Sequence, residues 1–173
     1  RRIDDLGRVV IPKEIRRTMR IREGDPLEIY TSADGEVIFK KYSAINEMAS
    51  SASQVAEVMT RLANCPTVVF DRDHVVAVAG VQKKEFSERR VSRALEEYLE
   101  SRKNYIRSSS ADAKVFPVEG VDQAALACSP ILASGDVTGA VAFLAPNDSA
   151  VANEVQQNLI QAAAQFLGKQ IED

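Results

Sequence analysis

Basic side chains are concentrated in the first 22 residues of this chain. The stretch holds eight basic and three acidic residues, a local charge of +5, whereas the whole chain of 173 residues carries −3. The basic residues are Arg1, Arg2, Arg8, Lys13, Arg16, Arg17, Arg20 and Arg22. Cationic groups gathered on an otherwise acidic protein are typical of a surface that holds an anion, most commonly nucleic-acid phosphate. Charge alone also leaves open a solvated surface without a ligand.

Short elements are expected to position these side chains. Residues 4–7, Asp-Asp-Leu-Gly, have the composition of a turn, and the β-branched run at residues 9–11 predicts a short strand. Pro12 suits the first position of a helix, which is expected over residues 13–19. The basic groups therefore come from a turn, a strand end and a short helix, which folding can bring to one surface.

The run LGRVVIPKEIRR, within RRIDDLGRVVIPKEIRRTMRIREGDPLEIY, resembles the AbrB-type DNA-binding domain of bacterial transition-state regulators. The resemblance implies a DNA-contact role for Arg1, Arg2, Arg8, Arg16 and Arg17. The whole chain is similar to a family of spore-development regulators that join this domain to a GAF-like sensor domain. That family usually has several residues before the position of Arg1, so the first strand is expected to be only partly present.

Residues 1–43 are expected to form this mainly β domain. Residues 27–31 and 36–41 predict two strands joined around Asp34-Gly35, a strong hairpin signal. A unit this small, without a disulfide or a metal, buries too little apolar surface to fold alone, so we expect it to oligomerise. The resemblance implies a swapped-hairpin barrel made by two chains, which would double the arginine surface and match the two-fold symmetry of duplex DNA.

Residues 44–64 predict a linker helix that packs with the second domain, with Ser43 as its N-cap. Its apolar residues follow heptad steps of three and four. They are Ile45, Met48, Ala52, Val55, Met59 and Leu62. Two arrangements fit the pattern: a helix that packs its apolar face on its own domain, and a helix that pairs with its twin at an oligomer interface.

Residues 65–173 predict an α+β domain with an antiparallel sheet flanked by helices, in the manner of a GAF or a PAS domain. Its final helix is expected over about residues 149–171, capped by Asn147 or Asp148, and it is apolar on two faces. One face can pack on the sheet and the other then needs a partner. Ile160 and Leu167 of this helix are therefore further candidates for an oligomer interface.

Catalysis finds little support in the sequence. The single histidine, His74, lies in an expected turn, and no catalytic triad, Walker-type glycine loop or cluster of metal ligands can be built with it. No cofactor is evident, and a small-molecule effector of the GAF-like domain stays unknown. The spacing of Cys65 and Cys128 fits reduced core residues. No run approaches the ~18 apolar residues of a membrane span.

The sequence as a whole favours a non-enzymatic, homo-oligomeric transcription regulator of the sporulation type. Double-stranded DNA is the expected partner, the assembly a homodimer or a dimer-of-dimers homotetramer, and the location the cytoplasm, in association with the nucleoid. Two alternatives stay open: an antitoxin-like DNA-binding module, and a ligand-binding signalling protein without a DNA role. For the second domain, a dimerisation scaffold and a small-molecule sensor fit equally well.

Overall fold

The computed structural model describes residues 1–173 and divides into two compact units, Arg1–Tyr42 and Ser43–Asp173. The first unit contains a short helix, α1 (Lys13–Thr18), and a hairpin in which β1 (Leu27–Thr31) pairs antiparallel with β2 (Val37–Lys41). Gly35 closes the hairpin with φ at 85°, a left-handed conformation that favours glycine. The predicted hairpin around Asp34-Gly35 is confirmed.

The strand predicted at residues 9–11 is not formed in the single chain. These residues have no strand partner, and Val9 and Val10 are 48% and 66% exposed. A strand exists only where a neighbouring strand completes its hydrogen bonds, and the one sheet of this unit, β1–β2, does not extend to them. Pro12 is the N-cap of α1 and not its first helical residue.

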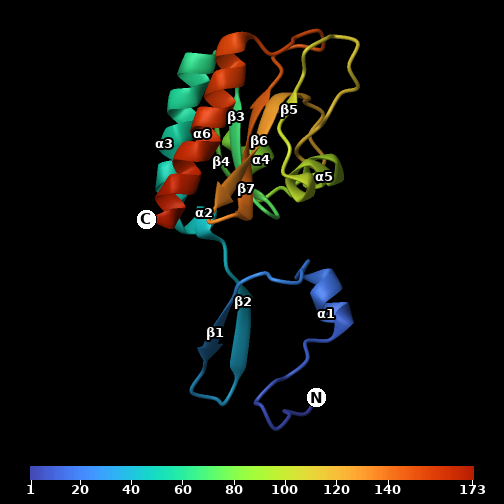
Figure 1. Cartoon of the computed structure of the whole chain (residues 1–173), viewed down its shortest axis with the longest axis vertical. Coiled ribbons are helices and arrows are strands. Elements are labelled where there is room, and N and C mark those ends of the chain that lie inside the picture. Colours follow the sequence, from blue (N-terminus) through green and yellow to red (C-terminus); the bar gives the residue numbers. More distant parts are fainter. The chain divides into compact units, whose positions relative to one another are not determined.

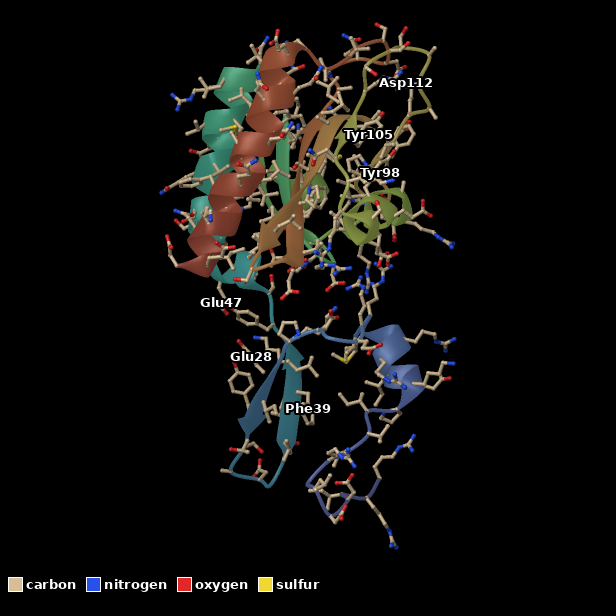
Figure 2. All side chains as sticks on the ribbon, viewed as in Figure 1. Glu28, Phe39, Glu47, Tyr98, Tyr105 and Asp112 are labelled. Atoms are coloured by element: carbon tan, nitrogen blue, oxygen red, sulfur yellow. The ribbon has the colours of Figure 1, made fainter.

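The first unit has no hydrophobic core of its own, because none of residues 1–42 is buried. Ile15 and Met19 of α1 and Ile29 of β1 are all more than 40% exposed. Phe39, seen on β2 in Figure 2, is 40% exposed. Side chains of these types are normally interior in a folded domain. The unit therefore presents an apolar surface that a single copy does not cover.

The second unit is an antiparallel five-stranded sheet between two layers of helices (Figure 1). The strand order is β4-β3-β7-β6-β5. The strands are β3 (Thr67–Asp71), β4 (Val75–Ala79), β5 (Tyr105–Ile106), β6 (Ala125–Ala133) and β7 (Asp136–Leu144). This is the antiparallel sheet flanked by helices that the sequence predicts.

The helices of the second unit differ from the predicted ones at two places. They are α2 (Ala44–Glu47), α3 (Ala49–Ala63), α4 (Lys83–Phe86), α5 (Arg93–Ser101) and α6 (Glu154–Glu172). The single helix predicted over residues 44–64 is interrupted at Met48, whose φ and ψ are −109° and 31°. Ser43 does cap the first piece, since its Oγ accepts a hydrogen bond from the Asn46 amide at 3.0 Å.

The final helix begins at Glu154, later than predicted, because Asn153 is its N-cap. The side chain of Asn153 accepts from the Gln156 amide at 2.8 Å, and the Gln156 side chain accepts from the Asn153 amide at 3.0 Å. This reciprocal capping box satisfies two amides that a helix start otherwise leaves unpaired. Neither Asn147 nor Asp148 caps the helix.

Two hydrophobic clusters fill the two faces of the sheet. Alternate side chains of β3 point to opposite faces, so Val69 joins one cluster while Val68 and Phe70 join the other. The first cluster packs α2, α3 and α6 on the sheet, and the second packs α4 and α5 on the opposite face (Figure 1). Both layers are therefore held by burial against a common sheet.

The heptad side chains pack mainly inside this unit. Ile45 and Ala52 are 0% exposed and Val55 is 9% exposed, while Met48 and Met59 pack against the same core. Ile160 and Leu167 of α6 are likewise 0% exposed. In the single chain these positions pack on the sheet of their own unit, and an interface at them stays a prediction. Leu62, at 59% exposure, is the one exposed side chain among the predicted interface residues, while Met48 and Met59 are partly buried.

Candidate nucleic-acid interface

Asp4 fixes the turn that carries Arg8. Its Oδ1 accepts hydrogen bonds from the amides of Leu6 and Arg8 at 2.9 and 2.8 Å, and its Oδ2 pairs with Arg8 Nε at 2.8 Å. These contacts, first the one from the Arg8 amide and then the one from its side chain, lower the pKa of Asp4. The Arg8 side chain is 70% exposed. The carboxylate engages Nε, so the terminal guanidinium nitrogens still face solvent.

Two further arginines, Arg16 and Arg17, lie on α1. Arg16 Nε donates to the carbonyl oxygen of Ile11 at 3.0 Å, which turns its side chain back onto the extended residues that follow Arg8. Arg17 Nη2 pairs with Glu14 Oε2 at 2.8 Å across one helical turn. Both side chains are exposed. Such a pair in water is weak and can be exchanged for a phosphate contact.

A separate contact ties the end of α1 to the hairpin. Lys41 Nζ, at the end of β2, donates to the carbonyl oxygen of Arg20 at 2.9 Å. The Ile21 amide donates to Arg16 O at 2.8 Å, which closes the helix while Arg20 takes a left-handed φ of 55°. No local sequence pattern predicts this contact of Lys41, because its partner lies 21 residues away.

The structure thus associates three of the five arginines predicted for DNA contact. Arg8 follows the turn fixed by Asp4, and Arg16 and Arg17 lie on α1, which the hydrogen bond from Arg16 to Ile11 ties to the extended residues between them. Arg1 and Arg2 precede this turn and are exposed. Guanidinium groups presented in this way suit phosphate oxygens and the edges of guanine. Asp4, which orients Arg8, is the residue that the sequence identified only as part of a turn.

The second unit does not show a clear arrangement of catalytic side chains. His74 Nδ1 lies 2.7 Å from Asp71 Oδ1, which also accepts from the amides of Asp73 and His74 at 2.8 Å. The hydrogen bond to Asp71 raises the pKa of His74, against the opposing effect of burial. Burial would raise the pKa of Asp71, but its hydrogen bonds outweigh that effect and lower it. The pair braces the turn between β3 and β4.

The two cysteines are buried and free. Burial raises the pKa of the Cys65 thiol to about 11 and that of the Cys128 thiol to about 12, so both stay protonated. The predicted role as reduced core residues is confirmed. No group of three or more metal-ligating side chains is placed to hold an ion. None of the helices has the length and hydropathy of a membrane-spanning segment.

Comparison with sequence families gives two adjacent matches. The family described as stage V sporulation protein T C-terminal, transcription factor, matches residues 47–172. The family described as antidote-toxin recognition MazE, bacterial antitoxin, matches residues 1–45. The matches define a regulator with an N-terminal domain of the AbrB and MazE type and a separate C-terminal domain.

Individual relatives agree with these matches. Stage V sporulation protein T of Bacillus subtilis (strain 168) is 42% identical over 174 residues, covering 99% of this chain and 96% of the relative. The transition state regulatory protein AbrB of the same organism is 46% identical over 84 residues, covering 49% of this chain and 85% of AbrB. The chain belongs to the stage V sporulation protein T family, which is a family of transcription factors and not of enzymes.

Solved structures show the fold of the second unit. A GAF domain/HD domain protein from Geobacter sulfurreducens aligns with a TM-score of 0.54 at 14% identity, covering 75% of this chain and 93% of that chain. A free methionine-R-sulfoxide reductase from Thermoplasma acidophilum aligns with a TM-score of 0.55 at 10% identity, covering 73% and 94%. At these identities the likeness concerns the fold alone, and the second unit is GAF-like.

Proposed function

We propose that this regulator binds double-stranded DNA through Arg1, Arg2, Arg8, Arg16 and Arg17. The observation that carries the proposal is the pairing of Asp4 with Arg8 Nε, which holds the Arg8 side chain while leaving it 70% exposed. Most of these contacts would go to phosphate, with some to base edges in the major groove. Membership in a transcription-factor family supports this use of the basic surface.

Pairing of the first unit with a second copy is part of the same proposal. No residue of the unit is buried, and its apolar side chains include Val9, Val10, Ile15 and Phe39. A partner hairpin and a partner strand at residues 9–11 would cover these side chains and complete the unpaired backbone. Two-fold symmetry would then present two sets of arginines to DNA.

A second self-association surface is proposed on the outer side of α3 and α6. These two helices pack side by side (Figure 1). Exposed Val58 and Leu62 are four residues apart on α3. On α6, the stripe Val155, Leu159, Ala162 and Phe166 recurs at helical spacing opposite the buried stripe. Two copies of such a helix pair form a four-helix bundle, so a dimer of dimers is the assembly that both surfaces support.

The proposed function also implies where the protein acts and what the GAF-like unit does. A DNA-binding regulator works in the cytoplasm, associated with the nucleoid. The GAF-like unit would set the oligomeric state and respond to a small molecule. Of the two alternatives, an antitoxin-like DNA-binding module is supported by the family match at residues 1–45. The remaining three-quarters of the chain matches a transcription-factor family, which favours the regulator.

The decisive experiment measures DNA affinity against salt concentration. Arg8→Ala, Arg16→Ala and Arg17→Ala should each weaken binding to a duplex that contains the target sequence, and each should make the salt slope shallower by about one unit. Arg61→Ala, an exposed arginine of α3, is the matched control and should bind like the wild type. A DNA affinity that changes neither with salt concentration nor with the three substitutions would reject the proposal.

A further inference from the structure

A second basic segment lies in the GAF-like unit, which is otherwise acidic. Residues 42–173 carry twelve basic and seventeen acidic residues, a net charge of −5. Within them, residues 83–93 hold five basic and two acidic residues, a local charge of +3. The basic residues are Lys83, Lys84, Arg89, Arg90 and Arg93, and all five are exposed. We refer to these five residues as the 83–93 basic segment.

Backbone hydrogen bonds hold the middle of this segment in place. The carbonyl oxygen of Arg89 accepts from the Val75 amide, and that of Arg90 accepts from the Glu119 amide, both at 2.9 Å. The amide of Val91 donates to Asp73 O, also at 2.9 Å. The segment is therefore fixed between the β3–β4 turn and residues 117–119. Cations on a fixed backbone lose less conformational entropy when they bind a partner than cations on a mobile loop.

Arg89 has a defined position on this surface. Its Nε donates to the carbonyl oxygen of Glu85 at 2.7 Å. Its Nη1 occupies the space beside Gly120, where a Cβ atom would come within 2.6 Å of that nitrogen. Arg89 therefore packs across the loop, while Lys84, Arg90 and Arg93 are the exposed cations beside it.

The segment lies at the end of the unit where the chain enters it. α3 runs away from α2, and β3 starts beside the far end of α3, where Thr60 Oγ1 donates to Thr67 Oγ1 at 3.1 Å. β3 then returns, so the β3–β4 turn lies toward the α2 end of the sheet (Figure 1). The backbone of His74, in that turn, forms an isolated antiparallel β-bridge with Arg90. Only Tyr42 and Ser43 connect β2 to α2, so the Cα atoms of Lys41 and Ala44 lie at most ~11 Å apart.

We propose that the 83–93 basic segment is a second contact surface for the phosphate backbone of DNA, outside the sequence that the first unit contacts. The proposal rests on the DNA-binding function proposed above. The two units are joined by two residues only, and the cations of the segment would be drawn to phosphate while the acidic remainder of the GAF-like unit would be repelled. Contacts of this kind add affinity without sequence preference.

The test uses the full chain and a duplex of about 40 base pairs, with affinity measured over a range of salt concentrations. The variant is Lys84→Gln with Arg90→Gln and Arg93→Gln. Each lost phosphate contact removes ~0.9 from the salt slope, so the slope should fall by about 2 to 3. The matched control is Lys103→Gln with Lys114→Gln and Lys169→Gln, three exposed lysines of the same unit. It changes net charge equally and should leave the slope near that of the wild type.

A charge-preserving variant separates contact from folding. Lys84→Arg with Arg90→Lys and Arg93→Lys should retain the wild-type slope, and all variants should melt at the wild-type temperature. Equal slopes for the glutamine variant and its lysine control would overturn the proposal. Loss of binding in Arg8→Ala with an unchanged slope in the glutamine variant would reject this inference alone. A wild type that shows no salt-dependent binding would reject the proposed function itself.

Discussion

Gly168 of α6 lies against the backbone of Leu132 in β6, so closely that a Cβ atom at position 168 would come within 2.2 Å of the Leu132 carbonyl oxygen. Real Cβ atoms do not approach an oxygen this closely, and the obstacle is backbone and not a flexible side chain. The absence of a side chain at Gly168 therefore sets how near the helix can pack to the sheet. Ile160 and Leu167 of the same helix belong to the core cluster that this packing forms.

Gly168→Ala should destabilise the GAF-like unit. In an exposed helix the same change stabilises by about 1 kcal/mol, because alanine has the higher helix propensity. Here the clash with Leu132 O would push α6 off the sheet, and we expect a net loss of about 2 kcal/mol in the free energy of unfolding. Urea denaturation measures it. Gln165→Ala, at an exposed position of α6, is the control. Increased stability in Gly168→Ala would contradict the close packing.

His74 provides a pH-dependent contribution to stability. The pKa of His74 is raised above 6.5 and that of Asp71 is lowered below 3.8. The stabilisation is therefore complete between these two ordinary values. It is lost as pH rises through the raised pKa of His74, and separately as pH falls through the lowered pKa of Asp71. The imidazole side chain is 39% exposed, so we expect the effect to stay below about 1 kcal/mol.

The measurement compares the free energy of unfolding at pH 6 and pH 8 in the wild type and in His74→Asn. The wild type should be less stable at the higher pH, and the variant should be nearly independent of pH over this interval. The chain has a single histidine, so no other imidazole contributes. A variant that keeps the full wild-type pH dependence would show that the His74–Asp71 pair is not its source.

The parts of the fold that sequence predicted best are those set by local chemistry. Asp34-Gly35 marks the hairpin and Ser43 caps α2 because turn and cap preferences depend on neighbouring residues alone. The predicted strand at residues 9–11 does not form, because a strand depends on a partner strand that the single chain does not contain. The start of α6 was placed too early because Asn147 and Asn153 are equally good caps by residue type, and only the reciprocal bond with Gln156 distinguishes them.

The candidate DNA interface was predictable in its residues but not in its geometry. The charge of residues 1–22 and the motif identify the arginines. The Asp4–Arg8 and Arg16–Ile11 contacts depend on how the turn and the helix fold back.

The heptad pattern could not separate packing on the sheet from packing on a second chain, since both bury the same side chains. For Ile45 and Ala52, the sheet of the same chain is the partner.

Charge placed on the outer side of α3 and α6 should divide the proposed assembly. Leu62 and Phe166 are 59% and 51% exposed, so Leu62→Glu with Phe166→Glu leaves each protomer folded. At an interface between copies, the two carboxylates would be desolvated without partners, at a cost of several kcal/mol. Sedimentation velocity should therefore show a species of half the wild-type mass, with pairing through the first unit retained.

The control for this substitution is Ser50→Glu with Gln161→Glu, at exposed polar positions of the same two helices. It adds the same charge away from the apolar stripe and should keep the wild-type mass. An unchanged mass in Leu62→Glu with Phe166→Glu would show that the outer face is not an interface.

Arg107 should act as a local brace for the serine-rich loop. The residue is 1% exposed, and its guanidinium donates to the carbonyl oxygens of Ser110 and Asp112 at 3.0 and 3.1 Å. Figure 2 shows Asp112 in the same loop, beyond the paired rings of Tyr98 and Tyr105. Arg107→Met would remove these bonds together with a buried charge, so we expect a change in global stability of less than about 2 kcal/mol.

The loop itself should respond much more strongly. In Arg107→Met, amide hydrogen exchange at residues 108–112 should accelerate at least tenfold, while exchange in β6 and β7 stays slow. Lys114→Met, which removes the ion pair with Asp148 at the surface, is the control and should leave this loop protected. Uniform acceleration over the whole unit would point to a global role for Arg107.

The proposed pairing of an N-terminal unit that has no buried residue would make the amount of protein itself a signal. In the proposed pairing, the DNA-binding unit is complete only when two copies meet, so the population able to recognise a promoter would rise with the square of the concentration or more steeply. A small increase in synthesis then produces a sharp change in occupancy, and dilution reverses it. Under this pairing, cells that divide the protein unevenly would pass from one transcriptional state to another without any other signal.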